Sequence, residues 1–372
     1  MTAAEILRKL VAIPTPSSVS NTALLDWVAG FLDRRGWRAE FFAYEDEAGV
    51  VKANLIAWPG TAERPEFFDL AFICHTDTVP FAANWAEALT LEQRGDALHG
   101  CGSCDVKGAL ACFLAAVTAL DSAAIGRPIA LILTADEEIG CKGMERLLNS
   151  AKLRIGSAIV SEPTSLQAGI AGKGYGLARI TVEGKEAHSA FPQQGVSAIS
   201  AAVRLVSRIE AKFSSQGNNS KEDVLFDPPR TTLNIGIIEG GTAKNIIPGR
   251  CSFLVEWRAI PGEAPSAVFE SLRELAAAET DHRLSIHIEA LRAEPGFSPA
   301  QQGSLQLRLA EALGGNPIGI SFGSEASRVA RIADEVIVIG PGDMRTAHSD
   351  RECVPIAELE RWTSLLASLM HS

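Results

Sequence analysis

Nowhere does the sequence contain a run of about eighteen apolar residues, the length that a membrane-spanning helix requires. We also expect no secretory signal, because Glu5, Arg8 and Lys9 interrupt the apolar residues near the N-terminus. Charges of both signs are mixed along the chain, and no run of one sign is long enough to indicate a charged tail. These absences favour a soluble globular protein with no membrane partner.

Basic residues are in the minority, since 34 Lys and Arg stand against 45 Asp and Glu, for a formal net charge of −11. Nucleic-acid binding depends on basic patches, so we expect no nucleic-acid partner. The seven cysteines are odd in number, and Cys74, Cys112 and Cys251 lie inside apolar runs, as reduced and buried thiols do. We therefore expect a cytoplasmic protein.

The 372 residues, 47% of them hydrophobic, suffice for two domains with substantial cores. Apolar runs alternate with helical patterns up to residue 162 and again after residue 293, which predicts an α/β fold with a helix-flanked, mostly parallel sheet. Residues 170–293 instead follow the strand and helix order of a split βαβ unit. We expect residues 1–169 and 294–372 to form one domain, into which residues 170–293 are inserted as an α+β domain.

Four short apolar runs each lead to histidine or acidic residues. They are 70–74 before His75 and Asp77, 129–133 before Glu137 and Glu138, 158–160 before Glu162, and 335–339 before a Gly-Pro loop that leads to His348. Such runs indicate buried parallel strands, whose carboxyl ends line the crevice where open α/β sheets bind ligands. Because several carboxylates are costly to desolvate without a cation, we expect a metal site there.

His75 and Asp77 are two residues apart, which places them on one face of a strand. We expect His75 to bind metal and Asp77 to accept the other ring N–H, although a solvated strand end is the alternative. Asp105 precedes a helix expected from Lys107, so it either caps that helix or bridges two metal ions.

Glu137 and Glu138 are adjacent acids, so their side chains point in different directions. One can ligate metal while the other acts as a general base on water, or both can lie in the acidic first turn of a helix. Two histidines and the carboxylates of Asp105, Glu138 and Glu162 make two three-ligand sites if Asp105 is shared. Three protein ligands with one open position are typical of catalytic zinc.

The remaining cysteine motif, Cys101-x-x-Cys104, has no second pair at suitable spacing and lies in a Gly-rich loop. We therefore expect neither a structural zinc site nor a redox pair there.

Four motifs occur in order along the chain: His75-Thr-Asp77-Thr-Val-Pro, Gly100-x-Gly-x-x-Asp105-x-Lys-Gly108, Asp136-Glu-Glu138-x-Gly140 and Ser161-Glu162-Pro-Thr164. Together they resemble the di-zinc metallopeptidase family of aminoacylase, carboxypeptidase G, succinyl-diaminopimelate desuccinylase and acetylornithine deacetylase, over nearly the whole chain. The resemblance implies that His75, Asp105 and Glu162 bind one metal ion, and that Asp105, Glu138 and His348 bind the other. It implies zinc, with cobalt or manganese as alternatives, Glu137 as the base and Asp77 as the orienting residue.

The motif Gly184-Lys-Glu-Ala-His188-Ser is similar to a segment of the family's inserted lid and dimerisation domain. This similarity implies a homodimer in which His188 reaches the partner's active site and polarises the substrate carbonyl. Segments 226–232, 240–248 and 322–326 are most similar to the acetylornithine deacetylase members. They imply that Asn245, Arg258, Gly323 and Ser324 hold the substrate carboxylate, which a guanidinium binds bidentately, whereas a surface ion pair is the alternative role of Arg258.

The resemblance implies metal-dependent hydrolysis of the amide bond of a small N-acyl amino acid. Nα-acetyl-L-ornithine, cleaved to L-ornithine and acetate in arginine biosynthesis, is the expected substrate. Succinyl-diaminopimelate, acetyl-citrulline, acetyl-lysine and dipeptides are alternatives within the family, and a metal-dependent binding protein without turnover is the non-enzymatic one. The sequence departs from the deacetylase pattern in two places: Cys101 replaces a frequent Arg, and Ser327-Arg328 replace Gly and apolar residues.

Overall fold

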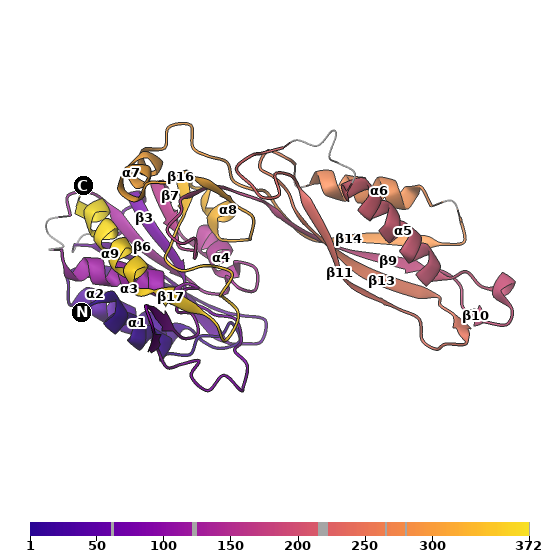
Figure 1. Ribbon diagram of the computed structural model, residues 1–372, viewed down its shortest axis with the longest axis horizontal. Coiled ribbons are helices and arrows are strands. Elements are labelled where there is room, and N and C mark those ends of the chain that lie inside the picture. The colour runs from indigo at the N-terminus through magenta and orange to yellow at the C-terminus, as the bar shows by residue number, and fades with distance from the viewer. Residues whose placement is uncertain (61–62, 121–124, 215–221, 265, 280, 372) are drawn as a thin grey trace. The chain divides into compact units, whose positions relative to one another are not determined.

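The computed structural model describes residues 1–60, 63–120, 125–214, 222–264, 266–279 and 281–371. The chain forms two compact units (Figure 1). The first unit contains residues 1–170, 299–318 and 324–372, and the second contains residues 171–298 and 319–323. Each unit has its own sheet and its own helices.

The first unit contains helices and strands that alternate from residue 107 to residue 160, as the sequence predicts. In chain order they are α1 (Ala3–Val11), α2 (Thr22–Asp33), β1 (Trp37–Glu45), β2 (Val51–Pro59), β3 (Phe67–His75), β4 (Glu92–Arg94), β5 (Ala97–His99), α3 (Lys107–Thr118), β6 (Ile129–Thr134), α4 (Lys142–Ser150), β7 (Arg154–Val160), β8 (Gly169–Gly172), α7 (Ser304–Leu313), β15 (Ile318–Ile320), α8 (Ala326–Val329), β16 (Ala333–Val338), β17 (Cys353–Pro355) and α9 (Ile356–His371).

An eight-stranded sheet forms the centre of this unit, in the order β1-β2-β6-β3-β7-β16-β8-β15. The strands β6, β3, β7 and β16, which contain the four apolar runs, are mutually parallel, whereas β1 and β2 add an antiparallel edge. The expected α/β fold with a mostly parallel sheet is therefore confirmed. Its central strands are apolar and buried along most of their length, as strands covered by helices on both faces must be.

Helices pack on this sheet according to their apolar faces. Figure 1 shows α1, α3 and α9 together on one side of the sheet, with α4 and α8 on the other. Every residue of α3 from Lys107 to Val117 is buried, because α1, α9 and the sheet surround this helix. The first helix, α1, begins with the capping box that Thr2 and Glu5 predict, since each side chain accepts the backbone N–H of the other residue.

The second unit has the split βαβ order. Its elements are β9 (Tyr175–Glu183), β10 (Ala187–His188), the short 3₁₀ helix η2 (Pro192–Gln194), α5 (Ala198–Ser214), β11 (Thr232–Gly240), β12 (Ile246–Ile247), β13 (Arg250–Arg258), α6 (Ser266–Ala277) and β14 (Ser285–Glu294). Four of these strands form an antiparallel sheet in the order β11-β13-β9-β14. The two-residue strands β10 and β12 pair separately.

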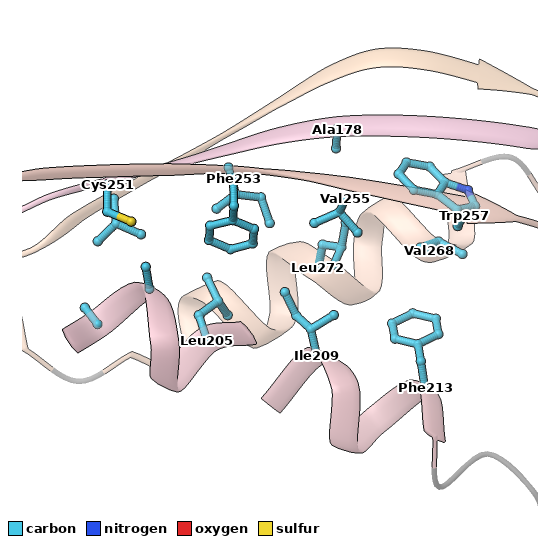
Figure 2. Packing of buried hydrophobic residues seen from close by; sticks show 14 of the residues in the cluster. Ala178, Leu205, Ile209, Phe213, Cys251, Phe253, Val255, Trp257, Val268 and Leu272 are labelled. Atoms are coloured by element: carbon cyan, nitrogen blue, oxygen red, sulfur yellow. The ribbon is translucent and has the colours of Figure 1, made fainter. Parts of the chain in front are cut away.

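The core of the second unit lies between this sheet and the helices α5 and α6. Alternate residues of β9 and β13 point toward the helices, so that Phe253 and Val255 meet Leu205, Ile209 and Leu272 (Figure 2). At one end Gly176 lies against the indole of Trp257, where an added Cβ would come within 1.8 Å of the ring. In the described part of the chain no helix has both the length and the apolarity to cross a bilayer.

Candidate metal centre and active site

The four parallel strands deliver the chemical residues to one edge of the sheet. In the pairing of β3 with β6, His75 lies opposite Thr134, and in the pairing of β3 with β7, Ile73 lies opposite Val160. The three strands therefore end side by side. The residues that immediately follow them include Asp77, Glu137, Glu138 and Glu162, and the loops before α3 and after β16 add Asp105 and His348.

Two groups of side chains at this edge have the composition and spacing of metal sites. His75, Asp105 and Glu162 form one group, and Asp105, Glu138 and His348 form the other, with the donor atoms of each group within 4.8 Å of one another. The carboxylate of Asp105 belongs to both. Its Oδ1 lies 3.1 Å from Nε2 of His75, and its Oδ2 lies 3.1 Å from Nε2 of His348.

The electrostatics of the first group indicate that a cation belongs there. His75, Asp105 and Glu162 are all buried. Burial raises the pKa of Glu162 well above its usual value, and the nearby carboxylates of Glu137 and Asp105 raise it further. Despite burial, the hydrogen bonds with His348 and His75 hold the pKa of Asp105 below its usual value.

His348 is half exposed, and its hydrogen bonds with Asp105 and Glu138 raise its pKa to about 10. In the absence of metal its imidazolium thus supplies part of the positive charge that these carboxylates require. One imidazole and two carboxylates per group form a donor set that divalent zinc, cobalt and manganese accept. The residues present therefore fit two divalent metal ions.

Asp105 is not the cap of α3. That helix begins at Lys107, and its capping residue is Val106, with no side-chain hydrogen bond at the cap. The helix-start alternative for Glu137 and Glu138 is also not supported, because α4 begins only at Lys142. The side chains of Asp105 and Glu138 lie in the metal-binding groups instead.

The carboxylate of Asp77 does not accept the ring N–H of His75, contrary to the expectation from the sequence. Nδ1 of His75 lies 3.0 Å from the main-chain oxygen of Asp77 but 3.8 Å from its Oδ1. The buried carboxylate instead accepts the N–H groups of Glu137 and Glu138, at 3.0 and 3.2 Å, and the hydroxyl of Ser17 at 2.7 Å. Asp77 thus orients the imidazole through its backbone and the Glu137-Glu138 segment through its side chain.

Glu137 belongs to neither metal-binding group. Burial raises its pKa to about 8, and the like charge of Glu138 adds to this effect. Its Oε1 accepts a hydrogen bond from the thiol of Cys141 at 3.2 Å. A carboxylate beside two cation sites, coordinated to neither, is available to take up a proton.

Glu352 is a site residue that the sequence did not reveal. Its buried carboxylate accepts the N–H groups of Gly102, Cys104 and Asp105, at 2.9, 3.1 and 3.1 Å, and so shapes the loop that carries Asp105. The glycines of that loop were the one available signal, since a turn rich in exposed N–H groups requires an acceptor. A cavity of about 490 Å³ borders the same region and is lined by Phe81, Trp85 and His348 among others.

In the second unit, His188 lies on β10 and pairs with Ile246 of β12. The imidazole is exposed, and its Nδ1 accepts the N–H of Ala190 at 3.1 Å. Asn245 immediately precedes β12, and its main-chain oxygen accepts the N–H of Ser189 at 3.0 Å. The structure therefore brings His188 and Asn245 together in one short ribbon.

Arg258 is the last residue of β13, and its guanidinium forms an ion pair with Glu256 at 2.8 Å and stacks over the ring of Tyr175. Gly323 lies beside it in the same unit, since a Cβ on Gly323 would be 3.4 Å from Nη1 of Arg258. Ser324 belongs to the first unit, where its hydroxyl accepts the N–H of Ala326. The ion pair that is the alternative role of Arg258 is thus present.

Comparisons with known proteins agree with this arrangement. Residues 170–283 match the family model of the peptidase dimerisation domain. The chain is 40% identical to an acetylornithine deacetylase of Myxococcus xanthus, over 97% of this chain and 94% of the relative. It is 30% identical to the acetylornithine deacetylase of Proteus mirabilis, over 99% of this chain and 96% of the relative.

Solved structures share the fold over almost the whole chain. A tripeptidase from Staphylococcus aureus aligns with a TM-score of 0.77 at 21% identity, covering 99% of this chain and 97% of that one. A dinuclear metal-binding peptidase of the M20 family from Bacillus subtilis aligns with a TM-score of 0.70 at 15% identity, covering 99% and 96%.

Proposed function

The chain belongs to the M20 metallopeptidase family and to its acetylornithine deacetylase branch, and from this membership we propose that it hydrolyses Nα-acetyl-L-ornithine to L-ornithine and acetate. The resemblance found in the sequence is confirmed, and with it the expectation of a metal-dependent hydrolase. The observation that carries the proposal is the pair of metal-binding groups that share Asp105 beside an uncoordinated Glu137.

Two divalent metal ions, with zinc as the proposed identity and cobalt or manganese as alternatives, fit the two groups. When bound, they polarise the amide carbonyl and lower the pKa of water. With both ions bound, their positive charge would offset the effect of burial, which raises the pKa of Glu137.

Glu137 is the proposed general base. It takes the proton of the attacking water, and it returns a proton to the nitrogen of the leaving amine when the amide bond breaks. The carboxylate of Asp77 accepts the backbone N–H groups of Glu137 and Glu138 and so keeps the base in place between these two steps.

The domain roles are also proposals. Residues 170–293 are the proposed lid and dimerisation domain, and residues 1–169 and 294–372 are the proposed catalytic domain. In the proposed homodimer, His188 of a second copy polarises the substrate carbonyl. Arg258 and Asn245, with Gly323 and Ser324, bind the substrate carboxylate, for which Arg258 exchanges its ion pair with Glu256.

A cytoplasmic location is proposed from the cysteines. All seven lie in the described part of the chain, and all are free thiols. Reduced thiols in this number suit a reducing compartment.

Hydrolysis of Nα-acetyl-L-ornithine by zinc- or cobalt-loaded protein, beside a chelated sample, tests the proposal. Metal-dependent turnover well above that on succinyl-diaminopimelate, acetyl-citrulline, acetyl-lysine and dipeptides would support the substrate. Turnover on one of those compounds instead would support metal-dependent hydrolysis but show that Nα-acetyl-L-ornithine is not the substrate. No turnover on any of them, with two metal ions bound, would favour a metal-dependent binding protein.

The role of Glu137 is tested by Glu137→Gln. We expect kcat to fall by about 10²- to 10⁴-fold, the usual contribution of a general base, while both metal ions stay bound. Glu47→Gln is the matched control, because Glu47 is an exposed acid paired with Lys142. Unchanged turnover in Glu137→Gln would exclude Glu137 as the base.

A further inference from the structure

Lys52 of β2 is a buried cation in the first unit, with 1% of its surface exposed. Its ammonium donates hydrogen bonds to the main-chain oxygens of Ser17 and Val19, both at 2.6 Å. It also lies 3.2 Å from Oδ1 of Asp136, a carboxylate that is equally buried. A buried ammonium is costly unless it is matched, and here Asp136 balances its charge while the two main-chain oxygens accept its hydrogen bonds.

Asp136 is the residue before Glu137, and its backbone is in the left-handed region with φ of 58°. A non-glycine residue in this region is strained and persists only where its surroundings hold it. Lys52 holds one carboxylate oxygen of Asp136, and the hydroxyl of Tyr44 donates to the other at 2.8 Å. The turn that aims Glu137 into the site is therefore fixed through the side chain of Asp136.

The ammonium of Lys52 is also connected to the carboxylate of Asp77, through Ser17. Lys52 holds the main-chain oxygen of Ser17, whose hydroxyl donates to Oδ2 of Asp77 at 2.7 Å. That carboxylate in turn accepts the N–H groups of Glu137 and Glu138. The ammonium of Lys52 thus supports Glu137 and Glu138 in two ways. It pairs with Asp136, which precedes them, and through Ser17 it is connected to the Asp77 carboxylate that accepts their backbone N–H groups.

We propose that Lys52, paired with Asp136, is a positioning residue for Glu137 and Glu138, although it contacts neither side chain. This inference rests on the proposed function, in which Glu137 is the general base and Glu138 is a ligand of one metal ion. A shift of about 1 Å in a catalytic group can reduce the rate by about 100-fold. Loss of the ammonium leaves the Asp136 charge uncompensated and frees the turn to move by such a distance.

The test compares Lys52→Met, Asp136→Asn, the double variant and Lys52→Arg, all loaded with zinc and assayed on the best N-acyl substrate of the wild type. We expect Lys52→Met to reduce kcat by about 100-fold with KM within about threefold, since substrate binding is not its role. The double variant should be no slower than Lys52→Met, because residues that act as a pair are not additive. Lys52→Arg, which keeps the charge, should recover part of the loss.

Metal titration provides a readout that does not depend on turnover. In Lys52→Met we expect one of the two ions, the one bound by the group containing Glu138, to bind about tenfold more weakly, because its ligand has moved. The other ion should bind as in the wild type. If the wild type hydrolyses none of the tested substrates, the proposed function fails, and this titration still decides the role of Lys52.

Lys173→Met is the matched control, because Lys173 is also a buried lysine, and it donates to the main-chain oxygens of Pro228 and Arg230 in the second unit. We expect it to lower the midpoint of thermal unfolding without changing kcat per metal-loaded chain. If Lys52→Met does not fold, Tyr44→Phe takes its place, with an expected fall in kcat of about fivefold from loss of one hydrogen bond to Asp136. Wild-type kcat together with wild-type affinity for both ions in the folded variants would overturn the proposal.

Discussion

At the scale of single residues, the surroundings of Glu137 matter as much as its identity. Cys141, the capping residue of α4, donates its thiol to Oε1 of Glu137 at 3.2 Å. A thiol is a weak donor, yet among the described residues it is the hydrogen-bond donor to this carboxylate. It therefore helps to select the rotamer in which the base faces the metal-binding groups.

We predict that Cys141→Ala lowers kcat about three- to tenfold, the equivalent of one ordinary hydrogen bond. Cys141→Ser should retain most of the activity, because a hydroxyl donates to the same oxygen. Steady-state assays of the zinc-loaded variants on Nα-acetyl-L-ornithine measure both effects. Equal kcat in the alanine variant and the wild type would show that the thiol does not orient Glu137.

The sequence predicted the metal-binding residues but not the residues that hold them in position. His75, Asp105 and Glu138 stand next to turn residues and strand ends, where a motif makes them visible. Lys52 and Glu352 could not be found in this way, because their partners lie far along the chain: Lys52 pairs with Asp136, and Glu352 binds the loop that contains Asp105. Such contacts exist only once the sheet has formed.

At the scale of elements, α3 is unusual because it buries a lysine as its first residue. Lys107 is 2% exposed, and its ammonium donates to the main-chain oxygen of Ile13 at 2.9 Å. Burial lowers its pKa from 10.5 to about 8. Between these two values the unfolded chain holds more protons than the folded chain, so the free energy of unfolding rises with pH in this window.

We therefore predict that the free energy of unfolding of the wild type, relative to Lys107→Met, increases by up to about 3 kcal/mol from pH 8 to pH 10.5. Urea denaturation of both proteins at several pH values measures this difference, and the subtraction removes the titration of all other groups. Lys142→Met serves as the control for the loss of a lysine side chain, because Lys142 is half exposed. If the free energy of unfolding changes with pH in the same way in the wild type and in Lys107→Met, the predicted effect of burying Lys107 is wrong.

Periodicity explains which elements were predictable. In residues 175–183, Ala178, Ile180 and Val182 alternate with Leu177, Arg179 and Thr181, a period of two that is typical of a strand, and the first three side chains are buried in the core of the second unit on β9. The short strands β4, β5, β10 and β12 contain two or three residues each, which is too few for a period to show. Their pairing is decided by partners elsewhere in the chain.

At the scale of the whole molecule, the sequence indicated the inserted unit by a change of pattern, from apolar runs that alternate with helices to the element order of a split βαβ unit. It did not give the order of the strands in the large sheet, where β6 lies between β2 and β3. That order depends on which crossovers the helices make, and local pattern does not record it. The proposed homodimer likewise came from the resemblance alone.

The dimer makes a prediction that depends on two copies of the chain. If His188 of one copy completes the active site of the other, His188→Ala and Glu137→Gln homodimers should each be nearly inactive. A mixed dimer then contains one complete site, with Glu137 from the His188→Ala copy and His188 from the Glu137→Gln copy. Random exchange of equal amounts should restore about one quarter of the wild-type activity, because half of the dimers are mixed and each has one of two sites intact.

Mixing the two variants after mild dissociation, and assaying metal-dependent hydrolysis against time, measures this recovery. The control mixture is Glu137→Gln with Glu137→Ala, which has no route to a complete site and should stay inactive. Recovery in the first mixture alone would show that the two residues act from different copies. A fully active His188→Ala homodimer would instead remove His188 from the reaction. Persistent inactivity of the mixture, with subunit exchange verified by differently tagged copies, would place both residues in the same copy.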